Sequence, residues 1–158
     1  LQLKARVYGV RYPEEALREL ACAGIEYRGW IPNFQVPEAF SKARVTVHVP
    51  RRPYAEALHG IPTIRPFEAL ACGIPLITAP WRDDEALFRF GEDMLVARNG
   101  LEMCEQLELA LGSGQRALEL TRAGRERILE RHTCAHRVDQ LLGIFAEVRQ
   151  HELAGHAA

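Results

Sequence analysis

The 158-residue chain lacks the features that mark several common classes of protein. Its 20 lysine and arginine residues balance 21 aspartate and glutamate residues, so its net charge of −1 gives no reason to expect nucleic acid as a partner. No apolar run approaches the roughly 18 residues of a transmembrane helix, and the N-terminus has no signal-peptide pattern. We therefore expect a cytoplasmic protein without a transmembrane segment, either free or peripheral at the inner face of the membrane.

Patterns for metals and redox cofactors are also scarce. The four cysteines are scattered and include no CxxC pair, which favours reduced, packed thiols over disulfides or a metal site. His132 and His136 lie four residues apart, but no third ligand is in register with them, so a zinc site is not expected. The loop at residues 9–12 lacks GxGxxG, which argues against a nicotinamide or flavin cofactor. We expect neither a metal nor a cofactor.

Strand and helix patterns alternate along most of the chain. The predicted strands are residues 5–10, 25–30, 45–49, 76–78 and 94–97, and the predicted helices are residues 13–23, 35–43, 66–72, 83–90, 100–111, 115–131 and 133–151. This alternation predicts an α/β fold, a doubly wound, Rossmann-like parallel sheet of about five strands flanked by helices, with a helical C-terminal end. The length is most simply that of a single domain, residues 1–158.

One loop is long for a connection from a strand to a helix. Residues 50–63 carry Arg51, Arg52 and His59 and lead into Thr63-Ile64-Arg65 at the start of a helix. Loops of this length are usually functional, and ligands of parallel α/β sheets bind at the carboxyl ends of the strands, where such loops lie. This loop and the helix after it therefore form the main candidate site.

The head of that helix carries charged residues that a buried strand–helix–strand unit does not need. A helix N-terminus offers free N–H groups and a partial positive charge, and the planar guanidinium of Arg65 also suits phosphate oxygens. Glu68, near the third helical position, has a carboxylate that could hold a pair of ribose hydroxyls. Two simpler interpretations stay open, in which Glu68 caps the helix and Arg65 is a solvated surface group.

A second charged stretch follows the next strand. Asp83, Asp84 and Glu85 fit the N-cap and first turn of a helix, and alternatively the acidic edge of a cleft. Trp81 beside them is expected at the rim of the cleft rather than in the core.

Residues 65–79, RPFEALACGIPLITA, resemble the E-A-(M/L)-A-C-G-x-P-(V/L)-I stretch in the C-terminal domain of GT-B glycosyltransferases, notably the retaining group 1, or family 4, enzymes. Residues 25–30 resemble the family's strand that ends in F-x-G, residues 43–50 its A-D-V-x-V-x-P segment, and residues 90–96 its G-x-(N/D)-G-x-L-V turn. The resemblance spans roughly residues 5–145. Its Arg-x-Phe-Glu helix head is most similar to the spore-maturation-type subgroup.

The resemblance implies roles for particular residues. Glu68 takes the place of the glutamate that binds the ribose diol, and the backbone at Thr63, Ile64 and Arg65 takes the place that approaches the diphosphate. The family's first glutamate, which contacts the donor sugar, corresponds to Gly60, so this chain departs from the motif there. In the family, a basic pair grips the diphosphate, and Arg11, Arg51 or Arg52 could take its place in this chain. No catalytic residue is assigned.

The activity implied is transfer of a hexose, with retention, from a nucleoside diphosphate sugar to an acceptor hydroxyl. The chain starts at Leu1 and runs straight into a strand, so we expect the donor-binding half of a longer protein, with the acceptor glycan, lipid or protein bound by a missing N-terminal domain. The isolated fragment is then expected to be inactive. A sugar-nucleotide epimerase-like isomerase and a degenerate, non-catalytic nucleotide-sugar-binding module remain alternatives.

Overall fold

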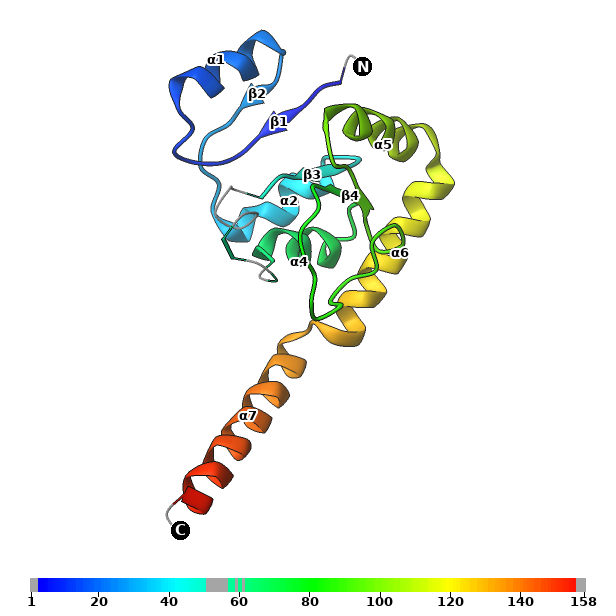
Figure 1. The fold of residues 1–158 in the computed structure, drawn as a ribbon. Helices are drawn as coiled ribbons and strands as arrows, with labels where there is room; N and C mark the ends of the chain where they lie inside the picture. The colour runs from blue at the N-terminus through cyan, green and yellow to red at the C-terminus, as the bar shows by residue number, and fades with distance from the viewer. Residues whose placement is uncertain (1–2, 51–56, 59, 61, 156–158) are drawn as a thin grey trace. The chain divides into compact units, whose positions relative to one another are not determined.

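The computed structural model describes residues 3–50, 57, 58, 60 and 62–155, with side chains described up to His151 (Figure 1). The chain divides into two compact units, Leu1–Ala43 and Arg44–Ala158. The first unit contains β1 (Arg6–Val7), α1 (Glu14–Cys22), β2 (Glu26–Tyr27), the 3-10 helix η1 (Asn33–Gln35) and α2 (Val36–Ser41). The second contains β3 (Thr46–His48), α4 (Ile64–Ala71), β4 (Leu76–Thr78), β5 (Leu95–Val96), α5 (Gly100–Gly112), α6 (Gly114–Arg131) and α7 (Cys134–Gly155).

The first unit is a small strand–helix–strand arrangement. β1 and β2 pair in parallel, with Arg6 opposite Glu26, and Arg6 Nε donates a 2.8 Å hydrogen bond to the Glu26 carboxylate. Between them, α1 begins with two glutamates beside its positive dipole end and closes before Gly24, whose φ of +69° suits glycine. The pattern of acids at the start and glycine at the end therefore predicted this helix correctly.

The second unit is built on a parallel sheet of order β3-β4-β5. In register, Thr46 lies opposite Leu76 and Thr78 opposite Val96. β4 is central, and its three residues are at most 1% exposed. A strand buried on both faces reads as a continuous apolar run rather than as an alternation, which is the pattern of this segment.

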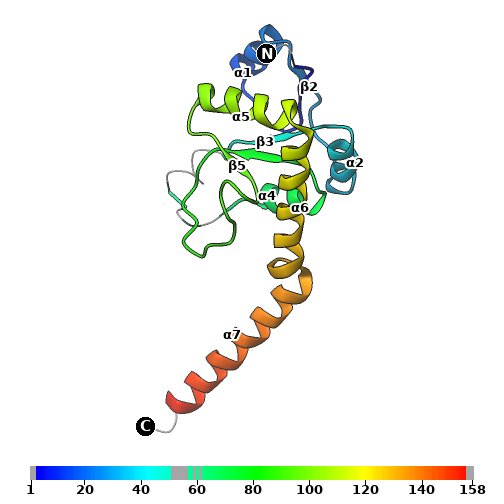
Figure 2. The ribbon, with the colours of Figure 1, turned by 90° about the vertical axis from the view of Figure 1, so that its right-hand side faces the viewer.

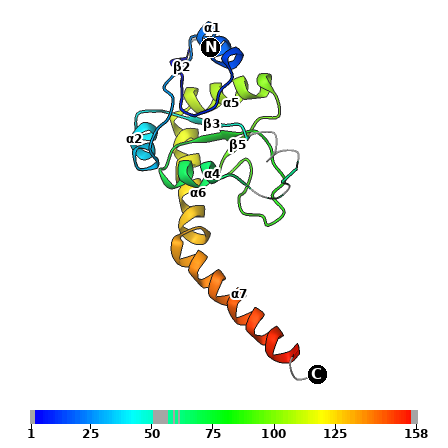
Figure 3. The same ribbon diagram turned by 90° about the vertical axis from the view of Figure 1, so that its left-hand side faces the viewer.

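Helices cover both faces of this sheet. Figures 2 and 3 show α5 on one face and α4 on the other, and α6 packs against both helices. The core on the α5 side is formed by Ile77, Leu95, Ala97, Ala110 and Leu120, with partly buried Val45, Met103 and Leu107 packed against it. A fully buried leucine or isoleucine side chain contributes about 1.5–3 kcal/mol, so this cluster is a main source of the unit's stability.

Several predictions of local structure can now be judged. Parallel strands flanked by helices are confirmed, but the strands described form separate sheets of two and three, so a single sheet of about five strands is not confirmed. The prediction of packed thiols was wrong, because all four cysteine side chains are free and exposed. No helix within the described residues combines the length and the apolar character needed to cross a membrane.

The predicted helix at residues 83–90 was also wrong. These residues form a loop, in which Ala86 has a left-handed φ of 47° that no α-helix accepts. The Asp83 carboxylate accepts hydrogen bonds from the N–H groups of Leu87 at 3.0 Å and Phe88 at 2.9 Å. Asp83 thus stabilises a loop by bonding to backbone N–H groups within it, instead of capping a helix.

Candidate functional site

The site begins at the N-terminus of α4, which lies two residues earlier than predicted. The helix starts at Ile64, with Thr63 as an extended N-cap residue, so Pro66 is the third helical residue rather than the first. Proline is tolerated there because first-turn N–H groups have no intrahelical acceptor. Glu68 is consequently the fifth residue of the helix, beyond the third position that a capping box uses. The prediction that Glu68 lies near the third position was wrong, and so was the capping alternative.

The N-cap side chain of α4 faces the sheet instead of its own helix. Thr63 makes no side-chain capping bond, and its Oγ1 lies 2.8 Å from Nε2 of His48, the last residue of β3. The other ring nitrogen, His48 Nδ1, lies 3.0 Å from Oγ1 of Thr78 at the end of β4. Since the Thr78 hydroxyl donates to the carbonyl of Ala79, it accepts from His48 Nδ1–H, and Nε2 accepts from the Thr63 hydroxyl.

With these donors and acceptors the His48 ring is neutral, because Nε2 carries no proton. Burial lowers the pKa of His48, and the positive charge of Arg65 lowers it further. The ring is 8% exposed and meets the indole of Trp81 edge-on, at 6.4 Å between ring centres. The Trp81 side chain is half-buried, and its Nε1 is buried without a hydrogen-bond partner among the described residues. His48 therefore joins the carboxyl ends of two strands to the start of α4.

Arg65 and Glu68 form an ion pair one helical turn apart, between Nη1 and Oε2. Their side chains are 48% and 22% exposed. An exposed pair of this kind is worth about 0–1 kcal/mol, so either group can exchange its partner for a ligand at little cost. The pair places a cation and a carboxylate together beside the open N-terminus of α4.

Gly60, just before this helix, has a conformation that excludes most side chains. Its φ is +77°, and a Cβ built on it would lie 3.1 Å from Oδ2 of Asp84. The Asp84 carboxylate is itself paired with Arg82 Nε at 2.6 Å. A glutamate at this position would be strained and would meet a like charge, so the departure from the family motif is built into the loop.

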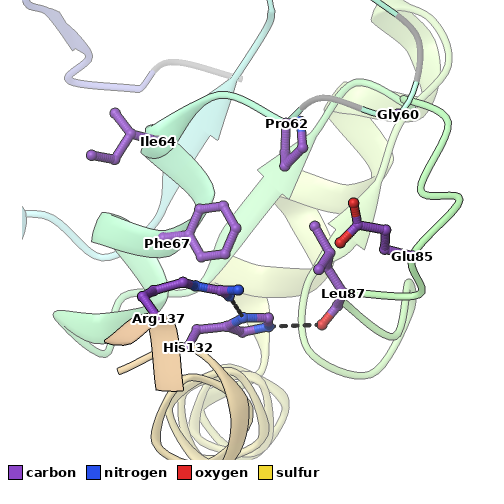
Figure 4. A pocket seen from close by; sticks show the side chains of 8 residues that line it. All are labelled: Gly60, Pro62, Ile64, Phe67, Glu85, Leu87, His132 and Arg137. Carbon is purple, nitrogen blue, oxygen red and sulfur yellow. Dashed lines mark hydrogen bonds between the residues drawn. The ribbon is translucent and has the colours of Figure 1, made fainter. Parts of the chain in front are cut away.

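A pocket of about 420 Å³ lies beside the head of α4 (Figure 4). Its lining comes from four segments: Gly60 and Pro62, the α4 residues Ile64 and Phe67, the loop residues Glu85 and Leu87, and His132 and Arg137 at the junction of α6 and α7. Phe67, Phe88 and His132 pack ring against ring, with centres 4.9–5.1 Å apart. The wall of the pocket is therefore aromatic, and its charged groups come from different elements.

His132 is held at both ring nitrogens. Its Nε2–H donates to the carbonyl of Leu87 at 3.0 Å, and its Nδ1 accepts from Nη2 of Arg137 at 2.5 Å, as the dashed lines in Figure 4 show. Burial lowers the pKa of His132, and the neighbouring arginines act in the same direction against the hydrogen bond to Leu87. The ring is thus a neutral bridge between a loop and α7.

The same loop is fixed by arginines of α6. Arg127 donates 2.7 Å hydrogen bonds to the carbonyls of Leu87 and Ala86, and Arg131 donates to Ala86 at 2.8 Å. These contacts hold the left-handed backbone of Ala86. The carboxylate of Asp93, which is fully buried, pairs with Arg89 at 2.7 Å and anchors the following turn.

The structure brings four of the six predicted binding residues to one place. Thr63, Ile64, Arg65 and Glu68 all lie at the head of α4. Arg11 belongs to the other unit, where it has a left-handed φ of 61°. Arg51 lies outside the described residues, as do Arg52 and His59.

Sequence reasoning missed the contributions of three polar residues to this region. His48 could have been found, because it lies near the carboxyl end of the predicted strand at residues 45–49, at the edge where ligands bind. His132 and Arg137 had no such signal, because His132 bonds to Leu87, 45 residues away, and Arg137 reaches the pocket through His132. Within the described ranges, no three histidine, cysteine, aspartate or glutamate residues are grouped as metal ligands.

Comparisons with known proteins agree with one another. A family model described as "Glycosyl transferase-like" matches residues 1–143. The structure is similar to HepE of Anabaena in complex with UDP and glucose (TM-score 0.77, 14% identity, 93% of this chain and 41% of that one). It is also similar to sucrose-phosphate synthase of Thermosynechococcus elongatus (TM-score 0.69, 19% identity, 87% of this chain and 34% of that one).

A third similar structure is the C-terminal domain of a group 1 family glycosyl transferase, LpcC, of Francisella tularensis (TM-score 0.59, 14% identity, 77% of this chain and 62% of that one). At these identities the likeness shows the fold alone. No curated protein matches the chain. The chain spans 41% of the HepE chain and 34% of the sucrose-phosphate synthase chain.

Proposed function

Because the chain belongs to the glycosyl transferase-like family, we propose that it is the donor-binding domain of a GT-B glycosyltransferase. The full protein would transfer a hexose from a nucleoside diphosphate sugar to an acceptor hydroxyl with retention of configuration. The match of the family model to residues 1–143 confirms the resemblance in the sequence at the level of the family. The assignment to the spore-maturation-type subgroup remains a proposal that follows from the helix-head motif, and the hexose and the retaining mechanism remain proposals that follow from the family resemblance.

The observation that carries this proposal is the head of α4. Its N-cap hydroxyl is committed to His48, so Thr63 does not cap the first-turn N–H groups of Ile64 and Arg65, and no other described side chain is bonded to them. A diphosphate would accept from these groups, and Arg65 would leave its ion pair to meet the phosphate oxygens. Glu68, one turn further along, would accept from the ribose hydroxyls.

The proposed chemistry needs only charge stabilisation from this domain. As the sugar leaves, negative charge grows on the diphosphate, and the helix N-terminus and Arg65 would stabilise it. Arg11 and Arg51 are further candidates for the phosphates. No metal or cofactor is part of the proposal, and nucleic acid is not a proposed partner. The acceptor glycan, lipid or protein would bind to an N-terminal domain outside this chain, in a cytoplasmic protein.

A second candidate function is a nucleotide-sugar-binding module without catalysis. The conformation of Gly60 favours it, because a carboxylate cannot be placed there without strain. Both candidates require the same ligand at the head of α4. They differ only in turnover by the full-length protein with an acceptor, and for the isolated chain we expect no turnover in either case.

The test is a panel of nucleoside diphosphates, with UDP, GDP and ADP each added to the purified chain during thermal unfolding. A ligand that binds only the folded state raises stability by about 2.7 kcal/mol at a hundredfold excess over its Kd. We expect one diphosphate to raise the melting temperature, and its bare nucleoside to raise it less. If none of them shifts the transition at millimolar concentration, the proposed function is wrong.

A further inference from the structure

The pocket beside the head of α4 carries opposite charges. Figure 4 shows the guanidinium of Arg137 on the same side as Phe67, and the carboxylate of Glu85 across from it beside Leu87. Neither charged group forms an ion pair with another described residue. The pocket thus offers one set of donors and one set of acceptors, separated by apolar surface.

Arg137 is held before any ligand arrives, and Glu85 projects from a loop whose backbone is fixed. Arg137 donates to His132 through Nη2 at 2.5 Å and to Gln140 through Nη1, also at 2.5 Å. His132 in turn holds the Leu87 carbonyl, and Leu87 is two residues from Glu85 in the loop that Arg127 fixes from α6. A preorganised guanidinium and a fixed loop backbone lose less conformational entropy on binding, so this arrangement favours a specific ligand over transient contact.

The shape and chemistry of the pocket fit a sugar ring. A volume of about 420 Å³ lies within the usual range for small-molecule sites. A pyranose has an apolar C–H face, which the ring of Phe67 can cover, and hydroxyls on its edge. A carboxylate only accepts hydrogen bonds and a guanidinium only donates them, so Glu85 and Arg137 together can distinguish the positions of hydroxyls.

The pocket also adjoins the proposed phosphate site, because Ile64 belongs to both. A ligand whose diphosphate lies at the head of α4 has its sugar within reach of this pocket. We infer that the pocket receives the sugar of the sugar nucleotide, and that Glu85 and Arg137 are its specificity-determining residues. This inference rests on the proposed function, and it assigns roles to two residues outside the helix-head motif.

The experiment compares UDP with UDP-sugars by calorimetry, since UDP is the nucleotide in the similar HepE structure. The sugars are glucose, galactose, N-acetylglucosamine and glucuronate, and the one that binds most tightly to the natural chain is used for the variants. Arg137→Ala and Glu85→Gln should each weaken that UDP-sugar about tenfold and leave UDP unchanged. Arg137→Lys, which keeps the charge but loses the planar fork, should recover part of the affinity.

Matched controls are Arg149→Ala, on the same helix with its guanidinium over the ring of Phe145, and Glu105→Gln, exposed on α5. Neither control should change either affinity. The inference is overturned if no UDP-sugar binds more tightly than UDP, if the pocket variants leave UDP-sugar binding unchanged, or if they weaken UDP and UDP-sugar equally. In all three cases binding of UDP persists, and the proposed function stands. Absence of binding by UDP and every UDP-sugar would overturn the inference, and the proposed function would fall with it if GDP and ADP also did not bind.

Discussion

The N-termini of α5 and α6 differ from that of α4 in what their capping side chains do. At α5, Asn99 accepts from the N–H of Glu102 at 2.9 Å, and the Glu102 carboxylate accepts from the N–H of Arg98 at 2.9 Å. At α6, Ser113 accepts from the N–H of Arg116 at 3.2 Å. At α4, Thr63 is also of a residue type that caps helices, yet its hydroxyl contacts His48.

We interpret the difference as one between helices that only build the fold, α5 and α6, and a helix that is also proposed to bind a ligand, α4. A capping side chain is worth about 1 kcal/mol, and α4 forgoes it while its third residue, Pro66, has no N–H at all. The helix instead has its first turn fixed to the ends of β3 and β4 by His48. We interpret the missing side-chain cap, at the edge of the sheet where ligands of parallel α/β folds bind, as a sign of the proposed anion-binding site.

The largest expected effect concerns the carboxylate beside that open N-terminus. If Glu68 accepts from both ribose hydroxyls, Glu68→Gln should weaken nucleotide binding by about 1.5–3 kcal/mol, because the charged acceptor is lost. The melting temperature of the free protein should hardly change, since only an exposed ion pair is removed. Calorimetry with the normal nucleotide gives the first number.

The same measurement with a 2′,3′-dideoxy nucleotide completes a double-mutant cycle. The natural chain should lose affinity for this analogue, and the Glu68→Gln variant should lose much less. Additive losses would mean that the carboxylate and the ribose do not meet.

Thr63→Val should have the next largest effect, and it should act on stability. It removes the hydroxyl that donates to buried His48 without removing a cap, and an unsatisfied buried acceptor costs about 1–3 kcal/mol. Urea unfolding should show this loss, and Thr63→Ser should restore most of the stability. A Thr63→Val variant as stable as the natural chain would show that the contact with His48 does not hold α4.

Asn99→Ala should cost about 1 kcal/mol of stability, because it removes a true cap from α5. Its effect on nucleotide affinity should be nil, which distinguishes a structural helix head from a binding one. A loss of affinity comparable to that of Glu68→Gln would remove the distinction between the two kinds of N-terminus.

The smallest expected effect is a dependence of stability on pH. The pKa values of His48 and His132 are both lowered from 6.5, chiefly by burial, so the unfolded chain binds more protons than the folded one below that pH. The stability from the two neutral rings is complete above about pH 6.5 and is lost as the pH falls towards their folded pKa values. Urea unfolding between about pH 7.5 and 5.5 should show this loss. The loss should shrink in His48→Gln, and an unchanged slope would mean that His48 titrates normally.

The sequence allowed much of this site to be found, but not its geometry. Arg65 and Glu68 were identified because charge at the head of a short helix has no structural need. The start of the helix was misplaced because proline favours the first helical position and disfavours helix in the residue before it. The structure keeps Arg65 helical before Pro66, a choice that tertiary contacts at Thr63 explain.

The prediction of a helix at residues 83–90 failed for a related reason. Three acids before an apolar stretch resemble a helix start, and alanine almost never signals a left-handed backbone. Ala86 adopts one because Arg127 and Arg131 donate to its carbonyl from more than 40 residues away. The contacts of His48 with Thr63 and Thr78 also join residues that are far apart in the sequence. A local sequence pattern does not predict contacts between such residues.

The most direct test of the central claim is the affinity of Arg65→Ala for UDP and for uridine. If the head of α4 binds the diphosphate, this variant should lose about 1.5–3 kcal/mol for UDP, or one to two decades in Kd, and nothing for uridine. Arg98→Ala is the matched control, because Arg98 also pairs with a glutamate at a helix head, that of α5. Its affinity for UDP should equal that of the natural chain. Equal losses for UDP and uridine in Arg65→Ala, or no loss for either, would contradict the assignment of the α4 head as a phosphate site.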